Sequence, residues 1–176
     1  MKRSIIFLFL IGLLSTLYAQ ESRFSLGIVG TRFSNTDNSN KLTEIEDPVG
    51  YGLMFAYAVN EHFSVALTGE YFKDDMEDYA GEERDIRTHL SGYLIPADFS
   101  GIKPYISFGV VYTNRNYDYT NEESENDNLF NGRFGAGLDY HIISNLNFNV
   151  DFGFYNDGLN FVGWTSSAGL RYGLNF

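Results

Sequence analysis

Apolar and polar side chains alternate along most of this chain of 176 residues. Residues 165–176 show the alternation clearly, with every second position apolar or aromatic towards the chain end. A period of two is that of an extended strand with one apolar face and one polar face. The same alternation occurs in residues 23–33, 49–59, 63–72, 85–95, 105–114, 129–141 and 146–155. The pattern therefore predicts an all-β chain of eight strands, each of about ten residues.

The faces of these strands indicate where the apolar side chains point. A membrane barrel turns its apolar face outward to lipid and its polar face into the lumen, and closure leaves no free strand edge. We therefore expect residues 20–176 to form an eight-stranded antiparallel up-and-down transmembrane β-barrel. A soluble lipocalin-like barrel is the alternative fold. It would need apolar residues inside and would leave an aromatic outer wall in water.

The connections between the expected strands alternate in length. Residues 60–62, 96–104 and 142–145 form short turns, and residues 34–48, 73–84, 115–128 and 156–163 form long polar loops. In outer-membrane barrels the short turns are periplasmic and the long loops extracellular. Aromatic residues near both ends predict two girdles at the membrane surfaces. They are Phe33, Tyr71, Phe72, Phe130 and Trp164 at the loop side, and Phe63, Tyr105, Tyr140 and Phe176 at the turn side.

The first nineteen residues have the three parts of a secretory signal peptide. Lys2 and Arg3 are positive, residues 5–14 are apolar, and residues 15–19 are small or polar. The apolar run is shorter than the roughly 20 residues that a spanning helix needs. We expect cleavage after Ala19 and export of residues 20–176.

The chain end carries a second sorting feature. Ser167, Gly169, Tyr172, Leu174 and Phe176 have the spacing, the face and the terminal position of a bacterial outer-membrane assembly signal. With the alternating strands, this ending resembles the small eight-stranded outer-membrane barrel families, the opacity-protein and porin-like domains of Gram-negative envelopes. The resemblance implies a location in the cell outer membrane, with membrane lipid and the barrel-assembly machinery as partners. It also implies an adhesive, structural or surface-interaction role.

Charge and composition limit the partners. The formal charge of −11 excludes nucleic acid, because no basic face can be assembled. Most of the 23 Asp and Glu residues fall in the expected long loops, which a solvated face explains. A surface ligand or divalent cations are the functional alternatives there. Asn35, Asp37, Ser39 and Glu46 follow an EF-hand-like register, but no helices flank them, so we expect neither a metal site nor a cofactor.

Six charged residues fall on the expected lumen face. They are Glu70, Arg87, Arg133, Asp139, Asp151 and Arg171. A hairpin centred between residues 78 and 79 would place Glu70 opposite Arg87, and we expect Asp151 and Arg171 to lie close on the last two strands. An eight-stranded barrel is just wide enough for side chains to fill it, and buried charges need partners. The sequence thus favours a packed polar lumen over a narrow pore.

Catalysis is the other functional class. Some outer-membrane barrels act on lipid or peptide with a histidine and a nearby Ser or Asp. His62 and His141 fall beside short turns, and His89 faces the lumen near Glu70 and Ser91. A relay there would open into a packed barrel, so we expect a satisfied interior histidine and no catalytic residue. A lipid-active enzyme stays the alternative.

Overall fold

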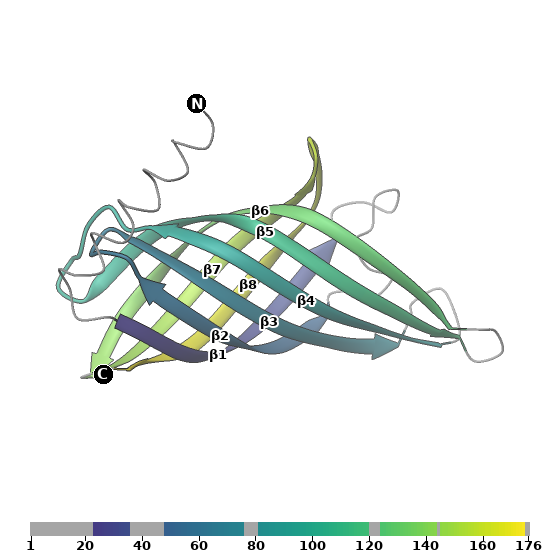
Figure 1. Cartoon of the computed structure of the whole chain (residues 1–176), viewed down its shortest axis with the longest axis horizontal. Coiled ribbons are helices and arrows are strands. Elements are labelled where there is room, and N and C mark those ends of the chain that lie inside the picture. The colour runs from purple at the N-terminus through teal and green to yellow at the C-terminus, as the bar shows by residue number, and fades with distance from the viewer. Residues whose placement is uncertain (1–22, 36–47, 76–80, 120–123, 144, 175–176) are drawn as a thin grey trace, which may run out of the picture.

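We analysed a computed structural model of the chain, which describes residues 23–35, 48–75, 81–119, 124–143 and 145–174 (Figure 1). These residues form eight strands. They are β1 (Arg23–Asn35), β2 (Val49–Ala58), β3 (Phe63–Asp75), β4 (Gly81–Leu94), β5 (Ile102–Tyr119), β6 (Glu125–Ile143), β7 (Leu146–Asp157) and β8 (Asn160–Leu174). No helix in the described part of the chain is long and apolar enough to cross a membrane.

The strands form one closed barrel in chain order. Each strand pairs antiparallel with its neighbours in sequence, and β1 pairs with β8 from Phe24↔Leu174 to Asn35↔Gly163. Where the barrel is closed, the backbone hydrogen-bonding groups of each strand have partners on both sides, which a membrane interior requires. The predicted fold class is confirmed.

The two faces of the sheet have opposite chemistry, as the alternation predicts. Large apolar side chains cover the outer wall: Leu53 is 69% exposed and Phe134 is 64% exposed. The inner face carries buried polar and charged side chains, among them Arg87, which is fully buried. An apolar exterior around a polar interior suits lipid outside the barrel.

The connections separate the two ends of the barrel. Residues 59–62, 95–101 and 145 lie at one end, here called the turn end. At the other, the hairpin end, β3 to β6 continue beyond the neighbouring strands and form a protruding sheet (Figure 1). The expected loops 73–84, 115–128 and 156–163 are therefore wrong in extent, because most of their residues are in strands. Residues 36–47 of the remaining loop lie outside the described residues.

Side-chain pairing explains why these polar segments are strands. On the outer face of the β5–β6 hairpin, Asn114 donates to Asn126 and Asn128 at 3.2 and 3.0 Å, and Asn126 donates to Asn116 at 2.9 Å. Cross-strand amide pairs of this kind stabilise a sheet in water as apolar pairs do in lipid.

Three aromatic residues assigned to the girdles point inward instead. Phe33 and Phe72 are fully buried in the lumen, and Tyr105 is 6% exposed. Alternation accounts for the correction, because each stands one residue from an outward-facing neighbour. Of the other girdle residues, Phe130 and Tyr140 do lie on the outer wall, with exposed fractions of 66% and 47%.

Gly52 on β2 and Gly69 on β3 are one residue out of register, since Gly52 stands opposite Glu70, and their surroundings differ. A Cβ added at Gly52 would stand 2.2 Å from the carbonyl oxygen of Gly69, whereas one added at Gly69 would meet nothing within 4 Å. Gly52 is therefore a position of close backbone approach, and Gly69 is not.

We expect Gly52→Ala to destabilise the barrel, because the clash is with rigid backbone. Gly69→Ala should be neutral or should stabilise it by about 0.5–1 kcal/mol, the usual cost of glycine in a strand. Urea unfolding of both variants in lipid vesicles measures the difference. Equal effects of the two substitutions would contradict the close approach.

Candidate functional site

The lumen is the candidate site, and all six charged residues expected there line it. Glu70, Arg87, Arg133, Asp139 and Asp151 are each at most 8% exposed, and Arg171 is half-buried. Their partners come from several strands around the barrel. The ion pairs are distributed along the barrel from the hairpin end to the turn end.

Glu70 and Arg87 are direct cross-strand neighbours on β3 and β4, as the hairpin centre predicts. They do not form an ion pair with each other in the described structure. Glu70 Oε2 lies 2.8 Å from His89 Nε2, and its Oε1 accepts a hydrogen bond from the Thr31 hydroxyl. The Arg87 guanidinium turns the other way and donates to Asp85 Oδ2 at 2.7 Å.

Arg87 is held between two aromatic rings at the hairpin end. Its guanidinium carbon lies 4.6 Å from the centroid of Phe33 and 4.2 Å from that of Phe72. Cation–π contacts strengthen when they are desolvated, and this side chain is fully buried. The guanidinium thus contacts two aromatic rings as well as the Asp85 carboxylate.

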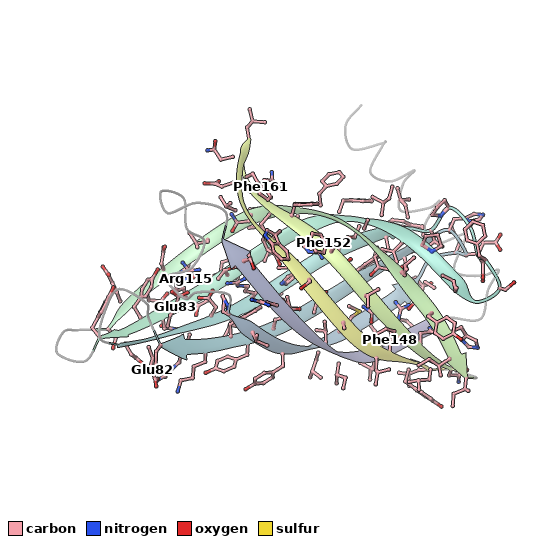
Figure 2. All side chains as sticks on the ribbon, turned by 180° about the vertical axis from the view of Figure 1, so that it is seen from behind. Glu82, Glu83, Arg115, Phe148, Phe152 and Phe161 are labelled. Atoms are coloured by element: carbon pink, nitrogen blue, oxygen red, sulfur yellow. The ribbon has the colours of Figure 1, made fainter. Side chains whose placement is uncertain are left out.

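Three network members were missed in the sequence because they fall in or beside an expected loop. Arg115 Nε lies 2.8 Å from Asp85 Oδ1 and 3.0 Å from Glu83 Oε1. Figure 2 shows Glu83 and Arg115 together at the hairpin end, from β4 and β5. Their register would have revealed them, since Asp85 and Arg115 are direct cross-strand partners. Together with Arg87 they form one four-residue ion-pair cluster.

Two further ion pairs lie nearer the turn end. Arg133 pairs with Asp151, and Ser107 joins them by accepting from Arg133 at 3.1 Å and donating to Asp151 at 3.3 Å. Arg171 pairs with Asp139 at 2.7 Å. The expected proximity of Asp151 and Arg171 is wrong. Asp151 stands opposite Ser167, so Arg171 is four residues further along β8.

An apolar cluster closes the lumen beside Arg87. It consists of Phe33, Phe72, Val111, Tyr155 and Val162. A cavity of about 30 Å³ lies next to it, lined by Glu70, His89, Arg133 and Asp151 among others. That volume suits one or two water molecules, because a single water needs about 10–15 Å³. A vestibule of about 610 Å³ opens at the turn end, lined in part by Asp139 and Arg171.

One histidine is buried in the lumen and two are exposed, as the alternation predicts. His89 is 6% exposed and faces Glu70 inside the small cavity, whereas His62 and His141 are exposed beside turns. The described residues contain no group of three or more His, Cys, Asp or Glu that could hold a metal ion. Of the EF-hand-like positions, Asp37, Ser39 and Glu46 lie outside the described residues.

Two carboxyl groups beyond the apolar outer wall, one at each end of the barrel, have pKa values below their usual range. Lys73 and Arg84 hydrogen-bond to Glu82 on the protruding sheet, and these contacts lower its pKa. At the turn end, the Gly101 backbone N–H donates to Asp98 and lowers its pKa. The stabilising contribution of each pair is present above the ordinary carboxyl pKa and is lost as pH falls through the lowered value.

A closed eight-stranded antiparallel barrel with an apolar exterior and a charged, packed interior defines the class of small outer-membrane barrels. The chain belongs to the outer membrane protein beta-barrel domain family, whose sequence profile matches residues 5–176. Membership places it in the outer membrane. No curated protein matches the chain.

Solved structures have the same fold at low sequence identity. The N-terminal β-barrel domain of Pseudomonas aeruginosa OprF gives a TM-score of 0.66 at 17% identity, over 88% of this chain and 98% of that one. P. aeruginosa OprG gives 0.67 at 16% identity, over 89% and 98%. Yersinia pestis Ail, the attachment invasion locus protein, in complex with the heparin analogue sucrose octasulfate, gives 0.65 at 15% identity, over 88% and 100%.

Arg87 offers a test of the lumen network. We expect Arg87→Ala to cost about 3–5 kcal/mol of unfolding free energy, because it removes one partner of a buried ion pair. Arg84→Ala, which removes the exposed ion pairs of Arg84 with Glu82 and Asp118, should cost at most about 1 kcal/mol. Urea titration in detergent micelles compares them, and unchanged stability of Arg87→Ala would count against a structural network.

Proposed function

We propose that this protein is a non-conducting outer-membrane barrel that interacts with partners at the cell surface through its protruding sheet. The observation that carries the proposal is the contrast between its two parts. Inside the membrane belt, ion pairs and the apolar cluster around Arg87 fill the lumen. At the hairpin end, β3 to β6 extend as a polar sheet (Figure 1). A filled lumen supports interaction rather than transport.

The orientation follows the rule for outer-membrane barrels, in which short turns face the periplasm. The protruding sheet is then extracellular and carries acidic residues, among them Glu82, Asp118, Glu125 and Asp127. Ail was solved with a sulfated polyanion. An acidic sheet repels such a ligand, so this chain suits basic partners or cation-bridged lipid. Divalent cations at the acidic surface stay a proposal.

Neither alternative function is favoured by a specific contact. A pore would need a continuous polar path, whereas Phe33 and Phe72 are fully buried against Arg87. Enzyme chemistry at His89 would need substrate access, whereas its cavity of about 30 Å³ admits only water-sized molecules. We therefore assign His89 a structural role beside Glu70.

Export and assembly belong to the same proposal. Residues 1–19 direct export as a cleaved signal peptide, and the barrel-assembly machinery recognises the chain end. Ser167, Gly169, Tyr172 and Leu174 lie on β8, which pairs with β1 and closes the barrel. Phe176 lies outside the described residues. The proposed assembly signal therefore lies on the strand whose pairing with β1 closes the barrel.

Planar-bilayer recording tests the closed lumen. We expect no steady conductance from the wild-type protein, because fully buried side chains fill the lumen around Arg87. Phe72→Ala with Arg87→Ala should introduce small, steady openings. Phe134→Ala with Phe152→Ala, on the outer wall, is the matched control and should stay silent. Steady wild-type conductance would contradict the proposal and favour the pore.

The absence of cysteine in the chain allows a test of orientation. We expect a membrane-impermeant maleimide to label Asn126→Cys on intact cells but to leave Glu61→Cys unlabelled until the outer membrane is opened. Both side chains are exposed, so accessibility depends on the side of the membrane. The reverse labelling pattern would place the protruding sheet in the periplasm and refute a surface role.

A further inference from the structure

One edge of the protruding sheet has no strand partner in the described structure. β6 pairs with β5 from Glu125 onward, but it pairs with β7 only from Gly132, which stands opposite Asn156. The tip of the β7–β8 hairpin bends away from the protruding sheet (Figure 1). A register shift between Tyr155 and Asn156 accompanies this bend. Residues 125–131 therefore present one open strand edge.

The direction of the backbone groups along this edge can be read from two hydrogen bonds. His141 N–H donates to Gly101 on the β5 side at 2.8 Å, so odd-numbered residues of β6 direct their backbone groups to β5. The β5–β6 register is continuous down to Glu125, and alternate residues face opposite neighbours. Asn128 N–H accordingly points away from β5, where the Asp127 carboxylate accepts it at 2.8 Å. Asn126, Asn128 and Phe130 thus present the edge donors and acceptors.

The side chains beside this edge favour one kind of partner. Glu125 and Asp127 are exposed on one face, spaced two residues apart. Asn126 and Asn128 are on the other face, where amide bonds hold them against β5. An added strand would place alternate side chains directly beside the two carboxylates, where opposite charges attract. An incoming carbonyl would replace the Asp127 carboxylate at Asn128 N–H and free that carboxylate for a cation.

We propose that residues 125–131 of β6 bind an extended basic segment of another protein as an added β-strand, with Lys or Arg at alternate positions beside Glu125 and Asp127. Main-chain hydrogen bonds supply the affinity, and the paired charges set the register. A second copy of the same edge is a poor partner, because two acidic pairs would approach each other. This inference rests on the surface role proposed above and names the partner class for it.

The test uses the full-length protein in lipid nanodiscs and a fluorescent peptide with alternating Thr and Lys residues. Anisotropy measures binding of this peptide, of a peptide with the same composition but contiguous lysines, and of one N-methylated on alternate backbone nitrogens. We expect the alternating peptide to bind. The other two should bind about tenfold more weakly or worse, because they lose the charge register or the edge hydrogen bonds.

The matched protein variants separate the edge from general charge. Glu125→Lys with Asp127→Lys should weaken peptide binding about tenfold or more. Asp75→Lys with Glu61→Lys changes the net charge equally, away from this edge, and should leave binding nearly unchanged.

Three outcomes would overturn the proposed docking edge: no binding, binding that ignores N-methylation, or equal loss in both charge variants. These outcomes leave the surface role itself standing if Asn126→Cys is labelled on intact cells. If that cysteine is not labelled, the protruding sheet is not at the cell surface. The surface role is then refuted, whatever the peptide binding shows.

Discussion

Closure of the sheet is the constraint on which the rest of the structure depends. In lipid every backbone polar group needs a partner within the protein, so eight strands must pair all the way round. Alternation then forces every second side chain into a bore that is just wide enough to be filled. Polar residues in that bore lose water and must satisfy one another. The ion pairs of Arg133 with Asp151 and of Arg171 with Asp139 are a consequence of closure rather than a separate device.

The interior charges show how such a bore can be satisfied. Arg87 donates to Asp85 and lies over the rings of Phe33 and Phe72, so this fully buried cation contacts a carboxylate and two aromatic rings. Arg115 shares the same carboxylate from the neighbouring strand. Glu70 differs, because its Oε2 lies 2.8 Å from the imidazole Nε2 of His89 and its Oε1 accepts from Thr31. These contacts and the apolar cluster beside them fill the lumen next to the small cavity that Glu70 and His89 line.

A period of two depends only on local backbone geometry, so the sequence was sufficient to predict the strand number, the faces and the inward position of Glu70. The Glu70–Arg87 register followed in the same way from the hairpin centre. Contacts across the bore were not predictable, because they depend on how strand tilt and side-chain length bring distant strands together. Arg171 therefore reaches Asp139 rather than Asp151. The polar ends of β4 to β6 were missed because strands in water lack the apolar alternation that marks strands in lipid.

The same hydrogen-bonding demand also determines where the protein can accept a partner. Within the membrane belt an open strand edge would be prohibitively costly, so β1 must meet β8 and no backbone group is left for binding. Above the belt water satisfies an unpaired edge, and β6 can extend past β7 without closing. An edge solvated by water can exchange that water for another strand at little cost. The closed part of the barrel is thus the rigid part, and the ends of the strands beyond it are where a partner can bind. Residues 125–131 lie just beyond the point at which β6 begins to pair with β7.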